Sequence, residues 1–205
     1  IKEEYLLDSA LEETNQWYAL AKISGIKLCE SLNLQYGIDA IALMPCNLYG
    51  KGDNYNPKTS HVIPALINKF YNAKENKNNE VICWGTGKPL REFLYVDDLA
   101  EASIFALENW NVNKYNSPVD NSSRKLYWMN VGSGSEISIK ELAEKIAKII
   151  GYKGNIVWDS EMPDGTPRKI LDICKIKSLG WEPKIKLEDG LKIAIKDYKD
   201  NFYLK

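Results

Sequence analysis

Tyr18 and Lys22 are the first pair of residues whose types and spacing could do chemistry. They lie four positions apart in the segment WYALAKISGIKLCESL, which begins at Trp17, and residues four apart share one face of a helix. A tyrosine hydroxyl is normally too weak an acid to donate a proton near neutral pH, and a nearby ammonium makes it a stronger one. The pair is therefore a candidate general acid, although an ordinary solvent-exposed helix face explains the same spacing.

His61 is the second candidate because it is the only histidine in the chain. It follows Ser60, which we expect to cap a helix over residues 61–76. On this position alone, a partly exposed histidine in a first helical turn is the simpler interpretation. A chemical role for His61 therefore needs support from the residues around it.

Composition excludes several classes of protein. The chain has 205 residues, 27% of them charged, and a net charge of −1, so there is no basic field for nucleic acid. No apolar run is long enough to span a membrane. The four cysteines, Cys29, Cys46, Cys83 and Cys174, are widely scattered without a CxxC pair, so we expect no metal site and reduced thiols in a cytoplasmic protein.

Helical and strand patterns alternate along the chain. Apolar residues recur at helical spacing from Asn15 to a stop at Gly37, and a short apolar run over 38–45 is typical of a buried strand. We expect a polar loop from there to Ser60. Further strands are expected over 80–85, 91–95 and 126–133, and further helices over 96–109 and 138–151, the last with a Ser138–Glu141 capping box. This alternation predicts an α/β fold with a mostly parallel sheet.

A dinucleotide-binding glycine loop is missing from the sequence. The first residues, IKEEYLLDSALEET, contain no Gly-rich strand–turn–helix pattern, and VGSGSE further along lacks the third glycine. We therefore expect the chain to be a piece of a longer protein.

Six segments occur in an order that resembles the GDP-L-fucose synthases, a family of extended short-chain dehydrogenases/reductases. They are WYALAKISGIKLCE, MPCNLYG, SHVIPAL, WGTGKPLREFLYVDDLA, NVGSG and PDGTPRK. The YxxxK pattern and REFLYVDDLA are shared by many nucleotide-sugar enzymes, whereas SHVIPAL and PDGTPRK are more specific. The resemblance covers essentially the whole chain.

This resemblance implies the C-terminal part of a Rossmann-type parallel sheet plus a smaller α/β substrate-binding domain. Residues 1–50 and 91–133 would belong to the NADP-binding domain, and residues 51–90 and 134–205 to the domain for the GDP-sugar. The family forms homodimers through the Tyr–Lys helix. Its glycine loop, catalytic serine and epimerising cysteine would precede Ile1, so we expect the 205 residues alone to bind NADPH poorly and to show no turnover.

The family epimerises carbons three and five of GDP-4-keto-6-deoxy-D-mannose and then reduces the 4-keto group with NADPH. By resemblance, Tyr18 donates the proton to the carbonyl oxygen, Lys22 holds the nicotinamide ribose, and His61 is the acid in epimerisation. The residues expected to contact NADP(H) are Tyr18, Lys22, Pro45, Cys46, Asn47, Leu48 and His61.

The same resemblance implies a set of contacts with the GDP-sugar. Trp84 would stack on guanine, Arg91 would clamp the diphosphate, and Lys69 stands where the family usually has arginine. Without the resemblance, Trp84 could equally pack in the core, and Arg91 could pair with Asp97 or Asp98. The complete expected set is Asn47, Val62, Leu66, Lys69, Trp84, Arg91, Asp164 and Lys169.

Two other functions stay open. One is another extended short-chain reductase for nucleotide sugars, such as a 4-epimerase or a 4,6-dehydratase. These reactions need no second acid at His61, so replacing that residue distinguishes such a reductase from a GDP-L-fucose synthase. The other is a non-catalytic module that binds nucleotide sugars.

Overall fold

Residues 1–203 are described by a computed structural model and form two compact units. Unit 1 comprises Ile1–Cys46, Leu99–Gly134 and Leu171–Glu182, and unit 2 comprises Asn47–Asp98, Ser135–Ile170 and the chain from Pro183 onward. The expected domain bounds differ most at Leu171–Glu182, which packs in unit 1 rather than with the second set of segments. The functions assigned to the two domains stay a prediction.

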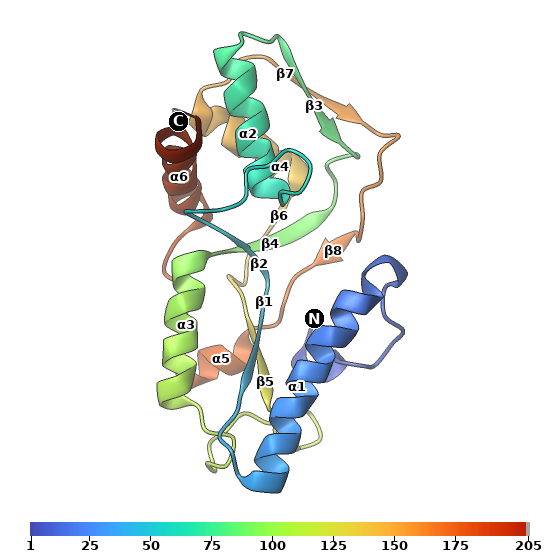
Figure 1. The fold of residues 1–205 in the computed structure, drawn as a ribbon, viewed down its shortest axis with the longest axis vertical. Helices are drawn as coiled ribbons and strands as arrows, with labels where there is room; N and C mark the ends of the chain where they lie inside the picture. Colours follow the sequence, from blue (N-terminus) through green and yellow to red (C-terminus); the bar gives the residue numbers. More distant parts are fainter. Residues whose placement is uncertain (204–205) are drawn as a thin grey trace. The chain divides into compact units, whose positions relative to one another are not determined.

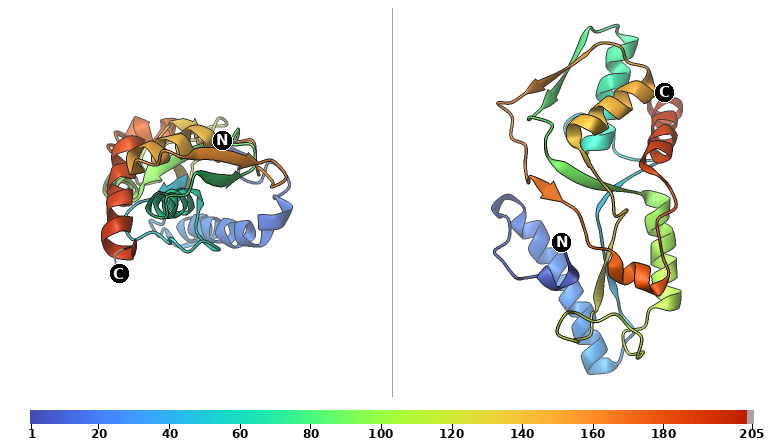
Figure 2. Two further views of the ribbon diagram at one scale, coloured as in Figure 1. Left: turned by 90° about the horizontal axis from the view of Figure 1, so that it is seen from above. Right: turned by 180° about the vertical axis from the view of Figure 1, so that it is seen from behind.

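Unit 1 is built on a parallel pair of strands. β1 (Ala42–Pro45) pairs with β5 (Trp128–Val131), in register from Ala42 opposite Trp128 to Pro45 opposite Val131. The helix α1 (Gln16–Tyr36) lies on one side of this pair, and the part of α3 (Val96–Asn109) from Leu99 onward lies on the other (Figures 1 and 2). The 3-10 helices η1 (Glu3–Tyr5) and η2 (Glu13–Asn15) precede α1, and α5 (Cys174–Leu179) packs beside β5.

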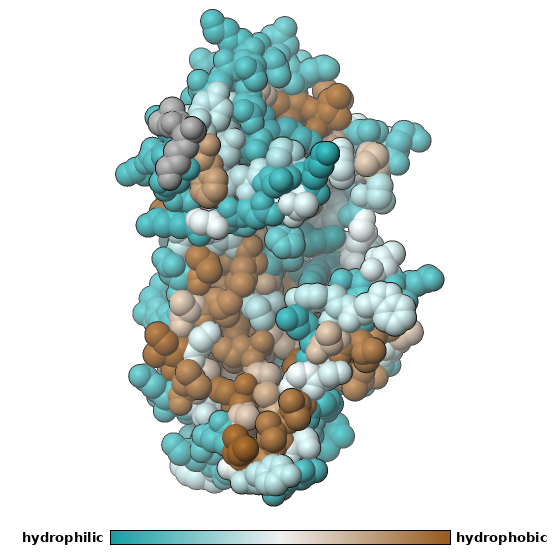
Figure 3. Space-filling view, viewed as in Figure 1, coloured by the Kyte–Doolittle hydropathy of each residue, from teal (hydrophilic) through white to brown (hydrophobic). Residues whose placement is uncertain are grey.

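The helix α1 ends where the sequence predicts. Gly37 adopts a left-handed conformation with φ of 68°, and its N–H donates to the carbonyl of Asn33 at 2.9 Å. Glycine takes this conformation without the penalty that a Cβ would bring. Only Ile23, Ile26 and Asn33 of this helix are buried. Apolar side chains therefore remain on the open surface over α1, β1 and α3 (Figure 3).

A buried ion cluster ties the start of the chain to the rest of unit 1. The Glu3 side chain is fully buried, and its Oε1 accepts a hydrogen bond from the Asn130 N–H at 3.0 Å. The ammonium of Lys175 lies 3.2 Å from Glu3 Oε2 and 3.0 Å from Glu4 Oε2. Because Asn130 is on β5 and Lys175 is on α5, the cluster holds η1 against both elements.

Replacing Lys175 by methionine is expected to destabilise unit 1 by about 3 kcal/mol, because it leaves the buried Glu3 carboxylate without its cation. Thermal unfolding measured by circular dichroism should show a midpoint lower by roughly 6–12 °C. The control is Lys177→Met on the same helix, since Lys177 and its partner Glu182 are largely exposed and should change stability by less than about 0.5 kcal/mol. Equal effects of the two replacements would contradict the assigned role of the cluster.

The strands of unit 2 form two small sheets. β2 (Asn47–Tyr49) runs parallel to β4 (Leu90–Tyr95), which also pairs with β6 (Glu136–Ser138) and β8 (Arg168–Lys169). β3 (Glu80–Trp84) pairs in parallel with β7 (Asn155–Asp159). The expectation of a loop starting at residue 45 is therefore wrong for Asn47–Tyr49, because these three residues pair with Phe93–Tyr95.

Three helices build the core of unit 2: α2 (Val62–Glu75), α4 (Ile139–Ile150) and α6 (Leu187–Tyr198), which is followed by the π-helical turn η3 (Lys199–Tyr203). Their inward-facing side chains, including Ile67, Phe70 and Leu142, are fully buried. The predicted capping box at the start of α4 is confirmed, with Ser138 and Glu141 bonding each other's backbone N–H groups.

The predicted α/β class with mostly parallel strand pairing is confirmed. Of the strand pairs in the described residues, only β4 with β6 is antiparallel. Within residues 1–203, every helix is too short or too polar to cross a membrane.

Candidate functional site

Tyr18 and Lys22 lie together on an exposed face of α1. The Lys22 ammonium is 5.3 Å from the centroid of the Tyr18 ring, and Tyr18 is 62% exposed. The sequence prediction that the two share one helix face is confirmed. The attraction between an ammonium and a phenolate is weak in water and grows when water is excluded. The pair can therefore assist proton transfer best when bound molecules displace water from it.

The four residues expected along the nicotinamide divide between the two units. Pro45 ends β1, and the Cys46 N–H donates to the Val131 carbonyl at 2.9 Å, which extends the strand pairing by one residue. The Cys46 side chain is buried, as expected of a small apolar filler. Asn47 and Leu48 start β2 in unit 2, where the Asn47 amide donates to the Glu92 carbonyl at 2.8 Å.

His61 lies at the start of α2 with an exposed side chain. The expected helix cap at Ser60 is wrong, because His61 occupies the N-cap position and the buried Ser60 hydroxyl has no hydrogen-bond partner within residues 1–203. Asp53 lies within electrostatic reach of His61. Partial burial raises the pKa of the Asp53 carboxyl, while the Asn54 N–H and the charge of His61 oppose that rise. Sequence reasoning missed Asp53 because no pattern links a loop carboxylate to a helix start.

Trp84 ends β3 with 66% of its surface exposed, so the alternative of core packing is wrong. The Lys69 ammonium lies 5.8 Å from its ring centroid and donates to the Ile82 carbonyl at 2.9 Å. Ile82 is also exposed, and it stands opposite the exposed Val157 of β7. An open indole face with a cation beside it suits a planar, negatively charged ligand.

Arg91, Asp164 and Lys169 also belong to unit 2. Arg91 on β4 stands opposite Lys169 on β8, and its guanidinium donates to the Leu90 carbonyl at 2.8 Å. The alternative in which Asp98 pairs with Arg91 is not what the structure shows, since Asp98 accepts backbone N–H groups of residues 184 and 185. Asp164 accepts two hydrogen bonds from Thr86, both at 2.6 Å. Sequence reasoning missed Thr86.

Two further expected substrate residues are on α2. Val62 is half-buried, and Leu66 is 6% exposed and belongs to the core of unit 2. The side chain of Leu66 therefore supports the helix from inside, and its role toward a ligand stays a prediction.

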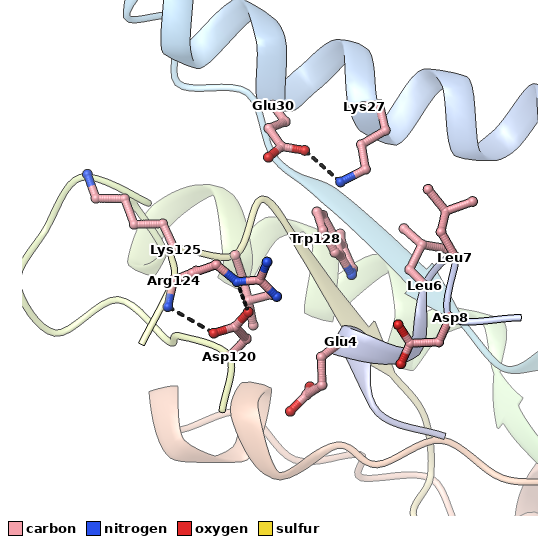
Figure 4. A pocket seen from close by; sticks show the side chains of 11 residues that line it. Glu4, Leu6, Leu7, Asp8, Lys27, Glu30, Asp120, Arg124, Lys125 and Trp128 are labelled. Atoms are coloured by element: carbon pink, nitrogen blue, oxygen red, sulfur yellow. Dashed lines mark hydrogen bonds and ion pairs between the residues drawn. The ribbon is translucent and has the colours of Figure 1, made fainter. Parts of the chain in front are cut away.

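None of these residues lines the cavity of about 300 Å³ in unit 1 (Figure 4). It is lined by charged side chains of α1 and of residues 120–125, with Trp128 at its wall. Lys27 pairs with Glu30 at 2.8 Å, and Arg124 pairs with Asp120 at 2.6 Å. Because no residue expected to contact the cofactor or the substrate lines the cavity, it is not the candidate site.

Comparison with known families decides the relationship. The model of the NAD dependent epimerase/dehydratase family matches residues 1–117, which is more than half of the chain. The chain belongs to this family. Within the family, the chain is 51% identical over 201 residues to the probable GDP-L-fucose synthase 1 of Oryza sativa subsp. japonica, covering 98% of the chain and 57% of the relative. It is 48% identical over 199 residues to the GDP-L-fucose synthase of Escherichia coli K12, covering 97% of the chain and 61% of the relative.

Solved structures of the family agree with these matches. The GDP-L-fucose synthetase of Naegleria fowleri bound to NADP superposes with a TM-score of 0.84 and 27% identity, covering 99% of this chain and 61% of that one. The chain therefore spans about three fifths of the length of the relatives that it matches.

Proposed function

We propose that this chain is part of an enzyme that epimerises carbons three and five of GDP-4-keto-6-deoxy-D-mannose and reduces its 4-keto group, forming GDP-L-fucose. The observation that carries this proposal is the arrangement in unit 2. An exposed indole has Lys69 beside it, and Arg91 and Lys169 stand opposite each other on adjoining strands. An aromatic stacking face with a cation beside it, together with further cations in the same unit, is the chemistry that a nucleoside diphosphate requires. Identities of 51% and 48% to relatives named GDP-L-fucose synthase support the same substrate.

The residues on α1 fit the expected cofactor, NADP(H). A phenol and an ammonium on one exposed face, 5.3 Å from ring centroid to Nζ, are suitable donors for ribose hydroxyls. When bound, NADPH supplies the hydride. The Cys46 N–H already donates to Val131, so this part of the expected nicotinamide wall would contribute packing rather than that hydrogen bond.

The catalytic residues serve two separate proton transfers. Tyr18 gives its hydroxyl proton to the oxygen on carbon four, and Lys22 stabilises the phenolate that remains. His61 protonates a sugar carbon from the face opposite to the base that removed the first proton. Asp53 lies within electrostatic reach of His61.

We also propose that the enzyme is a cytoplasmic homodimer that pairs through α1. Support comes from the large apolar side chains that this helix leaves exposed, among them Trp17, Leu20, Leu28 and Leu34. Patches of this kind often mark a protein–protein interface.

Replacing Trp84 by alanine is expected to weaken the binding of GDP by about ten- to a hundredfold, because stacking on an aromatic side chain is worth about 1–3 kcal/mol per base. Isothermal titration of GDP into the 205-residue protein measures this directly, since every residue proposed for the nucleotide is in the described chain.

The matched control is Trp17→Ala, which removes an equally exposed tryptophan from unit 1 and should leave the affinity for GDP unchanged. The proposal fails if the unmodified protein gives no saturable heat with GDP, or if both replacements have the same effect.

A further inference from the structure

Thr86 and Asp164 form a two-point clamp in unit 2. The Thr86 N–H donates to Asp164 Oδ1, and the Thr86 hydroxyl donates to Asp164 Oδ2, each at 2.6 Å. Both carboxylate oxygens are thus engaged by one residue that is 78 positions earlier in the chain. The Thr86 hydroxyl and N–H hold the pKa of Asp164 below its usual value despite some desolvation, with the charges of Lys88 and Arg91 adding to the effect.

The backbone around the clamp is shaped to bring the two residues together. Gly85 has a φ of 77°, and a Cβ at this position would overlap the Asp164 carboxylate. Gly87 has a φ of 73°, and a Cβ there would come within 2.9 Å of the Trp158 ring. The segment GTG after Trp84 therefore combines two left-handed glycines with a threonine that hydrogen-bonds to Asp164.

The clamped loop reaches the basic residues of the proposed nucleotide site. The Pro167 carbonyl accepts a hydrogen bond from the Leu90 N–H at 2.9 Å, after which the loop enters β8 beside β4. A Cβ built on Gly165 would lie 3.6 Å from the Arg91 guanidinium. Fixing Asp164 thus fixes the loop against Arg91 and sets where Lys169 stands, while Trp84 is only two residues before Thr86.

We propose that Thr86 is a positioning residue for the nucleoside diphosphate: through Asp164 it holds residues 163–167 in the conformation that lies against Arg91 and leads into Lys169. Asp164 acts in this account as the anchor of the loop, because each of its carboxylate oxygens accepts a hydrogen bond from Thr86. The inference rests on the proposed function, because it assumes that this site binds GDP.

The test is a titration of GDP into the protein with Thr86→Val and with Thr86→Ser. Valine keeps the shape and the N–H but removes the hydroxyl donor. It should weaken the binding of GDP by about tenfold, as expected for the loss of a hydrogen bond to a charged group. Serine keeps the donor and should bind GDP within about twofold of the unmodified protein. Thermal unfolding of both variants checks that they fold.

Two further measurements separate positioning from a general loss of structure. Hydrogen exchange of amides in residues 160–169 should become faster in Thr86→Val without GDP and should be normal in Thr86→Ser. In an Asp164→Ala background, Thr86→Val should cause no additional loss of affinity, because its effect passes through that carboxylate.

The possible results divide clearly. If Thr86→Val binds GDP as well as the unmodified protein, or if Thr86→Ser is as weak as Thr86→Val, the clamp does not position the site and the inference is wrong, while the proposed function stands. If the unmodified protein does not bind GDP at all, the proposed function is wrong and the inference falls with it. The inference is supported if Thr86→Val weakens the binding of GDP, if Thr86→Ser binds GDP normally, and if Thr86→Val has no further effect in the Asp164→Ala background.

Discussion

Replacing Tyr18 by phenylalanine is expected to lower kcat for reduction of the 4-keto sugar by about 10²- to 10⁴-fold, the usual contribution of a positioned general acid. The phenyl ring keeps the shape of the residue and its contact with Lys22 but removes the proton. Affinity for GDP should not change, because the residues proposed for the nucleotide are all in unit 2.

This experiment uses a chimera in which the chain replaces the matching segment of the E. coli relative, which aligns with 199 of its residues. Consumption of NADPH gives the rate. The control is Tyr36→Phe, which removes a hydroxyl from the other end of the same helix, where Tyr36 is 72% exposed. A Tyr18→Phe chimera that reduces the substrate at the normal rate would exclude Tyr18 as the proton donor.

Replacing His61 by glutamine in the same chimera should lower the rate of epimerisation by about 10²- to 10⁴-fold, because glutamine cannot deliver a proton to carbon. Epimerisation can be followed apart from reduction by incubating the keto sugar in deuterium oxide without NADPH and measuring deuterium at carbons three and five. Tyr18→Phe should leave this exchange unchanged, so the two replacements should affect different steps.

Lys58→Gln is the matched control for His61, since it removes an exposed cation from the loop that leads into α2. Normal exchange in His61→Gln, with normal reduction, would favour a related reductase that needs no second acid at this position.

Local signals in the sequence were sufficient for several elements. Ser138 and Glu141 are three residues apart and Gly151 follows one helix length later, so the caps that begin and end α4 are near each other in sequence. The neighbourhood of Tyr18 and Lys22 likewise follows from helical spacing alone.

Features set by distant partners were not accessible in this way. Asn47–Tyr49 is a strand only because β4 lies beside it, and nothing in the three residues themselves indicates it. Leu171–Glu182 packs in unit 1 because the Asn130 amide donates to the Asp172 carbonyl and Ile173 is buried there. A pattern of alternating helices and strands does not say which sheet a segment joins.

The candidate site shows the same division. The roles proposed for Trp84, Arg91 and Asp164 rest on a family resemblance, and without it the sequence does not decide whether the Trp84 side chain is exposed. Thr86 was missed because its partner is 78 residues away, and a threonine between two glycines is also common in ordinary turns.

The most direct test of the proposed activity is to identify the product that the chimera makes from GDP-4-keto-6-deoxy-D-mannose and NADPH deuterated at the transferable position. We expect GDP-L-fucose with one deuterium on carbon four of the sugar, seen by nuclear magnetic resonance and mass spectrometry. A chimera that folds and binds GDP but leaves NADPH unconsumed, or yields a 6-deoxy sugar that keeps the D configuration, would contradict the account.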